Sequence, residues 1–324
     1  PERRSLDLLV PVSLSQVYEP GSTAKLVTAV TALSHRLGNV TCQCTGTIYV
    51  GKHRQQRVNC PCAARFREPG QPVTIAGMLK YSCNSEAWAL ARRMGAEALY
   101  EGYKNFRLFE PIELPGYGVT KPGLLPTREN RDQMWTVTAS FGQGIATTRL
   151  HLTRAFAAVA NGGRMMQPML VSETRSPEGD VIKKYTPRAI ATVASPEHCA
   201  TVMQYLVEGV KDGTGKSAQV NGFTIAGKTG SAQVFDRHGV VPGAFISSFA
   251  GIAPADDPAN AILVSVERPK GSTHGSVVAA PAFKEVAKMA LWCAGKVSRN
   301  PVQPAPAPRR ATNVSERRVA GGHT

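Results

Sequence analysis

The last third of the chain limits the possible folds more than any other part. Three successive segments, 223–234, 245–252 and 261–266, carry β-branched and aromatic residues and are separated by turn residues, which is the pattern of consecutive strands. Segment 277–293 then has apolar residues at helical spacing. Since helices also precede the strands, the order predicts an α/β fold of the α+β type, a mostly antiparallel sheet flanked by helices.

Helix-starting and helix-ending residues organise the preceding two thirds. Ser195, with Pro196 at the first helical position, starts a long helix that ends at Gly213. Helices are also expected at 22–37, 85–94 and 148–160, each followed by glycine or asparagine. Segment 46–60 has two β-rich stretches around a polar turn and predicts a hairpin. A short strand is expected at 6–10.

Composition suggests one large domain and a tail. The chain has 324 residues, 42% of them hydrophobic, which is enough to bury a sizeable core. We expect residues 1–295 to form that domain. From residue 296 the sequence is rich in proline, alanine and arginine, which predicts a disordered basic tail over 296–324.

The chain is basic, with a net charge of +15. Such a charge attracts anionic partners, including nucleic acid, phospholipid headgroups and acidic wall polymers. No recognisable nucleic-acid reader motif is present, so we expect no nucleic-acid partner. No apolar run approaches the ~18 residues of a membrane helix.

The first motif whose residues could carry out a reaction is Ser22-Thr23-Ala24-Lys25, at the start of an expected helix. Side chains at i and i+3 share a helix face, so Lys25 can reach the Ser22 hydroxyl. A serine is a weak nucleophile until a base takes its proton, and a lysine on an otherwise uncharged helix favours its neutral form. The alternative is an N-capping serine followed by an exposed lysine.

Two further motifs follow along the chain. Ser82-Cys83-Asn84 places a hydroxyl and a carboxamide two residues apart on a loop, although the pair could simply cap the next helix. Lys228-Thr229-Gly230-Ser231 lies in an expected strand. A lysine and two hydroxyls beside an open strand edge suit a peptide that ends in a carboxylate, and an edge strand with a solvated lysine is the alternative.

In this order, S-x-x-K, S-x-N and K-T-G resemble the motif set of penicillin-binding proteins and class A β-lactamases. More of the chain resembles class B penicillin-binding proteins, the septal and elongation transpeptidases, from about residue 17 to about 292. The resemblance implies a serine β-lactamase/penicillin-binding-protein-like fold. It rests on further segments: Tyr18-Glu19-Pro20-Gly21-Ser22, Phe141-Gly142-Gln143-Gly144-Ile145, Ala226-Gly227-Lys228-Thr229-Gly230 and Ser248-Phe249-Ala250-Gly251-Ile252.

The resemblance implies a peptidoglycan D,D-transpeptidase that penicillin acylates. Ser22 would attack the D-Ala-D-Ala carbonyl of a stem peptide and form an acyl-enzyme, with Lys25 taking its proton. Ser82 and Lys228 would pass a proton to the departing D-Ala. An amine of a neighbouring stem peptide would then resolve the ester and form the cross-link.

The resemblance also assigns the binding residues. Asn84 would hold the donor peptide, and the hydroxyls of Thr229 and Ser231 would bind its terminal carboxylate. Gly230 between them allows a close approach of another backbone. Backbone N–H groups of Ser22 and Ser231 would form the oxyanion hole.

The family implies a wider context as well. Its members carry a longer lead-in with strands of the same sheet, a pedestal domain and a membrane anchor, whereas only 21 residues precede Ser22 here. We therefore expect an N-terminal portion outside this sequence and a location on the extracytoplasmic (periplasmic) face of a bacterial membrane. The expected partners are stem peptides, β-lactam antibiotics, a glycosyltransferase and other cell-wall complex proteins. No cofactor and no metal are expected.

Rival functions remain within and outside this fold. A β-lactamase would need a base for deacylation, and the E-x-x-x-N signature of class A is not apparent around Glu110 and Glu113. A D,D-carboxypeptidase would share all three motifs. A catalytically inactive scaffold of the cell-wall complex is the alternative outside enzymes, although a scaffold has no need of the three motifs.

Four cysteines flank the expected hairpin, as Cys42-Gln43-Cys44 and Cys60-Pro61-Cys62. Residues at i and i+2 of a strand share a face, so the four sulfurs could converge. Some family members resemble this chain in having one cysteine pair around the same hairpin, which favours a Cys44–Cys60 disulfide in an oxidising location. A zinc site is less favoured because the usual C-x₂₋₄-C spacing is absent, and unpaired thiols are the third possibility.

Overall fold

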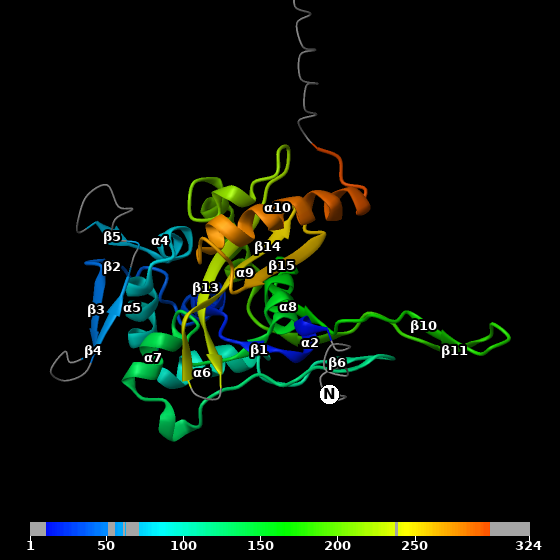
Figure 1. Ribbon diagram of the computed structural model, residues 1–324, viewed down its shortest axis with the longest axis horizontal. Helices are drawn as coiled ribbons and strands as arrows, with labels where there is room; N and C mark the ends of the chain where they lie inside the picture. Colours follow the sequence, from blue (N-terminus) through cyan, green and yellow to red (C-terminus); the bar gives the residue numbers. More distant parts are fainter. Residues whose placement is uncertain (1–10, 51–55, 61, 63–70, 237–238, 299–324) are drawn as a thin grey trace, which may run out of the picture.

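A three-stranded sheet crossed by α10 (Gly275–Cys293) lies at the centre of the molecule, beside a mainly helical region that contains α4 (Ile75–Tyr81) and α5 (Asn84–Met94) (Figure 1). The computed structural model describes residues 11–50, 56–60, 62, 71–236 and 239–298. The expected strand at 6–10 and nearly all of the expected tail at 296–324 lie outside these residues.

The sheet confirms the predicted antiparallel meander. Its order is β13 (Ala226–Asp236), β14 (Gly239–Ala253) and β15 (Asn260–Glu267), with β14 in the middle. The first strand begins three residues later than expected, at Ala226. The second begins at Gly239 instead of 245 because the β13–β14 ladder continues to the pair Asp236 and Gly239.

The two faces of β14 pack against different helices, because successive side chains of a strand point to opposite faces. Phe249 and Ala253 lie in an apolar cluster with residues of α10. Ala250 and Ile252 belong instead to the main core, together with residues of α8 (Arg149–Ala160) and α9 (Pro196–Lys211). Helices therefore cover both faces of the sheet, as the sequence predicted.

Phe283 makes the central contact between α10 and the sheet. Its ring is fully buried, and its centroid lies 4.7 Å from that of Phe249. Phe283→Ala is expected to lower the free energy of unfolding by about 3–5 kcal/mol, because it removes a buried ring and leaves a cavity. Urea unfolding measures the change. Met289→Ala on the exposed side of the same helix is the control and should change stability by less than about 0.5 kcal/mol; equal losses in the two variants would contradict the packing described here.

The expected helices form, with one difference at the first. Thr148 and Ser195 cap α8 and α9 through their side-chain oxygens. The segment predicted as one helix over 22–37 is instead a 3₁₀ turn, η1 (Gly21–Ala24), followed by α3 (Lys25–Ser34). The helix ends early because Arg36 adopts φ +61° in the left-handed region. The remaining helical elements are α2 (Val12–Ser15), α6 (Ala96–Asn105), η3 (Arg128–Asn130), α7 (Gln133–Ala139) and η4 (Lys216–Ala218).

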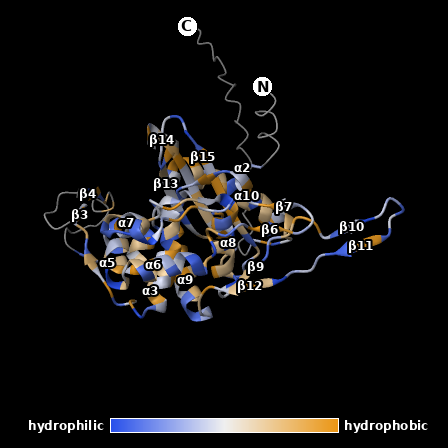
Figure 2. Cartoon of the chain, turned by 90° about the horizontal axis from the view of Figure 1, so that it is seen from below, coloured by the Kyte–Doolittle hydropathy of each residue, from blue (hydrophilic) through white to orange (hydrophobic). Residues whose placement is uncertain are grey.

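Small two-stranded ladders surround the core. The predicted hairpin near residue 50 is confirmed as β3 (Thr47–Val50) paired with β4 (Gln56–Asn59). The hairpin of β10 (Glu173–Arg175) and β11 (Val181–Lys184) projects from the body in both views (Figures 1 and 2). The other pairs are β1 (Val17–Tyr18) with β8 (Thr147–Thr148), β2 (Cys42–Gln43) with β5 (Pro72–Val73), β6 (Glu113–Leu114) with β7 (Gly118–Val119), and β9 (Arg164–Met166) with β12 (Ala189–Thr192).

Among the described residues, no helix combines the length and apolar character that a membrane crossing requires.

Candidate active site

The first motif lies where η1 passes into α3. Ser22 is in the 3₁₀ turn and Lys25 is the first residue of the helix. The Lys25 Nζ donates to the Ser22 Oγ over 3.1 Å. The structure therefore brings the predicted nucleophile and base into direct contact, through the i, i+3 relation that the sequence indicated.

Close backbone packing positions the turn against β13. Gly21 has φ +54°, and a Cβ at this position would lie 2.8 Å from the Ser231 carbonyl oxygen. A Cβ at Gly230 would collide with the Ser248 Oγ and would lie 3.1 Å from the Pro20 carbonyl oxygen. Glycine at both positions lets the nucleophile's turn lie directly on the strand of the third motif.

Lys25 is completely buried, and polar atoms of the second motif surround its amine. Its Nζ lies 2.8 Å from the Ser82 carbonyl oxygen and 2.7 Å from the Asn84 Oδ1. Burial lowers the pKa of Lys25 to about 8, and this effect is opposed by negative charge on the nearby sulfurs of Cys83, Cys60, Cys62 and Cys44. An amine with such a pKa exchanges protons readily near neutral pH.

The second motif occupies the short link between α4 and α5. Ser82 has φ +62° and ends α4, while Asn84 is the first residue of α5. A non-glycine residue in the left-handed region costs about 1–3 kcal/mol. This backbone conformation directs the Ser82 Oγ to within 3.3 Å of the Lys25 Nζ and 2.9 Å of the Lys228 Nζ.

The third motif lies on β13, where Lys228 is 1% exposed and Thr229 is 8% exposed. Besides the bond to Ser82, the Lys228 Nζ donates to the Thr229 carbonyl oxygen over 3.0 Å. The Ser231 side chain is on the exposed part of the strand. Its hydroxyl donates to the Thr273 carbonyl oxygen over 3.0 Å and accepts from the Gly275 N–H over 3.2 Å.

Three contacts at the site involve residues that the motifs do not include. The Thr229 Oγ1 donates to the Thr214 Oγ1 over 3.1 Å. The Asn84 Nδ2 donates to the Asn59 carbonyl oxygen over 3.1 Å, which joins the second motif to β4. Phe141 covers Lys25, with its ring centroid 6.0 Å from the amine. Only Phe141 had a sequence signal, the segment around Gly142.

The predicted Cys44–Cys60 disulfide is not formed in the structure. Both cysteines are free, and their sulfurs lie 3.5 Å apart, compared with about 2.05 Å in a disulfide. The two sulfurs are instead part of a larger group that includes Cys62 and Cys83.

Comparison with known proteins places this geometry in a family. The family described as "Penicillin binding protein transpeptidase domain" matches residues 10–288. Penicillin-binding protein PbpB of Mycolicibacterium smegmatis is 33% identical over 297 residues, which cover 86% of this chain and 44% of that protein. Stage V sporulation protein D of Bacillus subtilis is 32% identical over 282 residues, which cover 85% of this chain and 42% of the relative. The chain thus spans less than half the length of these curated relatives.

Solved structures agree with the predicted fold. Penicillin-binding protein 3 of Mycobacterium tuberculosis, complexed with aztreonam, superposes with a TM-score of 0.75 at 28% identity, covering 91% of this chain and 67% of that one. The transpeptidase domain of penicillin-binding protein 3 from Burkholderia pseudomallei gives a TM-score of 0.75 at 25% identity, covering 89% and 83%. The chain therefore belongs to the penicillin-binding protein transpeptidase family.

Proposed function

We propose that this chain is a serine D,D-transpeptidase that cross-links peptidoglycan stem peptides and is acylated by penicillin. One observation carries the proposal: hydrogen bonds join Ser22, Lys25, Ser82 and Lys228 in an unbroken series of 3.1, 3.3 and 2.9 Å. A nucleophile, a buried base, a hydroxyl and a second buried amine in series can move a proton from the attacking to the leaving group.

The reaction proceeds in two halves. Neutral Lys25 takes the proton of the Ser22 hydroxyl as its oxygen attacks the D-Ala-D-Ala or β-lactam carbonyl. The N–H groups of Ser22 and Ser231 stabilise the oxyanion. Ser82 and Lys228 deliver a proton to the nitrogen of the leaving amine. When the C–N bond has broken, the acyl group remains on Ser22 as an ester. An amine of a second stem peptide then attacks this ester, releases Ser22 and forms the new amide.

The binding roles follow from where the remaining polar groups lie. The Asn84 Oδ1 accepts from the Lys25 amine, and its Nδ2 donates to the Asn59 carbonyl oxygen. These bonds orient the Asn84 side chain to hold the donor peptide. Thr229 and Ser231 bind the terminal carboxylate beside Lys228, and Gly230 lets the peptide backbone approach. Penicillin-binding protein 3 of Mycobacterium tuberculosis has been solved in complex with aztreonam and with ampicillin, which supports β-lactams as ligands of this chain too.

We assign the activity to a domain of residues 1–295, followed by the basic tail. Its substrate is extracytoplasmic, so we place the domain on the outer face of the membrane, in a complex with a glycosyltransferase and other cell-wall proteins. The relatives named peptidoglycan D,D-transpeptidase support the peptidoglycan substrate from which we infer this location. A β-lactamase of class A is disfavoured because the hydrogen-bond partners of Lys25, within the described residues, are Ser22, Ser82 and Asn84, none of them a carboxylate base.

Covalent labelling with a fluorescent penicillin tests the function. Intact mass should rise by one penicillin per chain, and the adduct should persist after free penicillin is removed. Rapid loss of the adduct with release of hydrolysed penicillin would identify a β-lactamase instead. Incubation with a D-Ala-D-Ala peptide and an acceptor amine separates the remaining activities: a cross-linked product supports transpeptidation, and a shortened peptide alone indicates a carboxypeptidase.

The acylation rate should rise with pH through about 8, because the pKa of Lys25 is lowered to about 8 by burial and only the neutral amine accepts the Ser22 proton. The other buried lysine of the series, Lys228, donates to the Ser82 hydroxyl instead, and its proton serves the leaving group. Stopped-flow labelling across this pH range measures the profile, with circular dichroism as the control for folding. An acylation rate independent of pH across this interval would exclude Lys25 as the base.

A further inference from the structure

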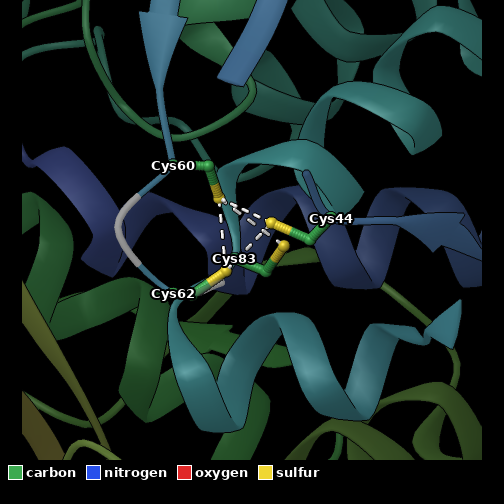
Figure 3. Close-up of side chains that lie close together, drawn as sticks. All are labelled: Cys44, Cys60, Cys62 and Cys83. Atoms are coloured by element: carbon green, nitrogen blue, oxygen red, sulfur yellow. Dashed lines mark hydrogen bonds between the residues drawn. The ribbon is translucent and has the colours of Figure 1, made fainter. Parts of the chain in front are cut away.

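Four cysteine sulfurs converge on one another (Figure 3), and one of them belongs to Cys83 of the second motif. Those of Cys44, Cys60, Cys62 and Cys83 all lie within 4.8 Å of one another. The closer pairs are 3.2 Å between Cys60 and Cys62, 3.4 Å between Cys44 and Cys62, 3.5 Å between Cys44 and Cys60, and 3.7 Å between Cys60 and Cys83. Four thiolates around one tetrahedral zinc ion, with Zn–S bonds of about 2.3 Å, lie about 3.8 Å from each other. The spacing of the sulfurs is therefore that of a tetrathiolate cage.

The cage draws its sulfurs from separate parts of the chain. Cys44 follows β2, Cys60 follows β4 and Cys62 comes two residues later, while Cys83 lies between α4 and α5. All four side chains are buried, with exposed fractions between 0% and 7%. Four protonated thiols gain little stability from being buried side by side, whereas a divalent metal that prefers sulfur ligands forms a bond with each of them.

Donors around the sulfurs favour thiolates. The backbone N–H groups of Asn84 and Ser85 lie 3.0 and 3.4 Å from the Cys60 sulfur. The Ser85 hydroxyl donates to the Cys44 sulfur over 3.4 Å. These N–H groups belong to the first turn of α5, where the helix dipole also favours negative charge. Outer donors of this kind orient the ligands of metal sites and tune their charge.

We propose that Cys44, Cys60, Cys62 and Cys83 bind one Zn²⁺ ion in a closed, tetrahedral structural site. Zn²⁺ is the metal that suits four thiolates in this geometry without redox chemistry. Binding replaces the thiol protons, which are released to solvent, and forms four Zn–S bonds. The site revises the sequence-based expectation of no metal. The C-x₂₋₄-C spacing is absent because a single residue separates Cys60 from Cys62, and the other two ligands come from distant segments.

The metal would hold the catalytic loop in place. Cys83 lies between Ser82, whose φ is +62°, and Asn84. A strained backbone persists only when its surroundings fix it, and a Zn–S bond at the adjacent residue does so. This consequence rests on the proposed transpeptidase function, whereas metal binding itself does not.

Metal content tests the site independently of activity. The reduced chain, supplied with Zn²⁺ and then desalted, should retain one Zn²⁺ per molecule by elemental mass spectrometry. Co²⁺ in its place should give the intense visible absorption of a tetrahedral tetrathiolate. Alkylation in denaturant without reductant should modify all seven cysteines. Pairs of cysteines that escape alkylation would indicate disulfides, and disulfides would overturn the proposal. Absence of bound Zn²⁺, or the presence of iron in the protein as isolated, would also overturn it.

Single substitutions identify the ligands. Cys62→Ser should reduce bound Zn²⁺ from one per chain to a trace, whereas Cys42→Ser and Cys293→Ser should retain it, because neither residue belongs to the four. Loss of metal in Cys42→Ser as complete as in Cys62→Ser would overturn the assigned ligand set. If Cys62→Ser does not fold, chelation of the wild-type chain followed by Zn²⁺ re-addition replaces it.

Acylation by fluorescent penicillin then reports the link to catalysis. Removal of the metal with a chelator should slow acylation by about 10- to 100-fold, the scale of a small displacement of catalytic groups, and Zn²⁺ should restore it. A metal-loaded chain that never acylates would refute the proposed function and leave the zinc site intact. Unchanged acylation after proven loss of the metal would refute the link to the catalytic loop.

Discussion

Ser22→Ala is expected to abolish the covalent penicillin adduct. The substitution removes the hydroxyl that attacks the carbonyl in the proposed mechanism, while its neighbours remain in place. Loss of a catalytic serine in other serine enzymes lowers turnover by about a millionfold, so labelling should fall below detection. Intact mass spectrometry after incubation with a fluorescent penicillin measures the effect.

The matched control is Ser34→Ala at the other end of α3. The Ser34 side chain is exposed. Its hydroxyl donates to the Val30 carbonyl oxygen of the same helix and contacts the ring of His198. This variant should label like the wild type. An adduct that persists in Ser22→Ala, on any residue, would show that the nucleophile lies elsewhere.

Lys25→Arg is expected to lower the acylation rate by about 10²–10⁴-fold, the contribution of a positioned base. Arginine keeps a positive charge and a long side chain, but it stays protonated in proteins and cannot take the Ser22 proton. The larger guanidinium also has to fit a site where Lys25 is completely buried. Rapid-mixing kinetics with a fluorescent penicillin gives the rate.

Two comparisons isolate the proton-accepting role. Lys25→Met removes the amine and keeps an unbranched chain, so it should be as slow as Lys25→Arg if the base is what matters. Lys80→Met, whose partner is Asp212 over 2.8 Å, removes a lysine outside the series and should acylate at the wild-type rate. Acylation by Lys25→Arg at the wild-type rate would assign the base role to another group.

Part of the arrangement of the proposed catalytic residues could be predicted because local geometry decides it. The i, i+3 spacing alone puts Lys25 beside Ser22, and β-branched and aromatic residues between turn residues predict β13. The three motifs come together only through the tertiary fold, and their proximity could be expected only from the resemblance to a known family. The left-handed Ser82 could not be predicted, since serine gives no sign of a positive φ.

Tertiary contacts also explain the predictions that were incomplete. Residue 22 lies in a 3₁₀ turn rather than an α-helix because the Gly21 N–H donates to the Gly142 carbonyl oxygen over 3.0 Å and Gly21 packs on Ser231. Thr214 was missed because it approaches Thr229 from the loop after α9, a distant part of the sequence. The four-cysteine group was visible in part, but Cys83 was assigned only to the second motif, and no local pattern linked it to the hairpin.

The position of Ser82 between two amines limits how protons can pass there. A hydroxyl has one hydrogen and two lone pairs. When Lys25 and Lys228 are both charged, their N–H groups occupy the lone pairs and the hydroxyl hydrogen faces neither amine. Loss of a proton from either lysine frees one lone pair, and rotation about a single C–O bond then turns the hydrogen toward the neutral amine. The direction of transfer is thus decided by which lysine is neutral, and reversing it requires no movement of a heavy atom.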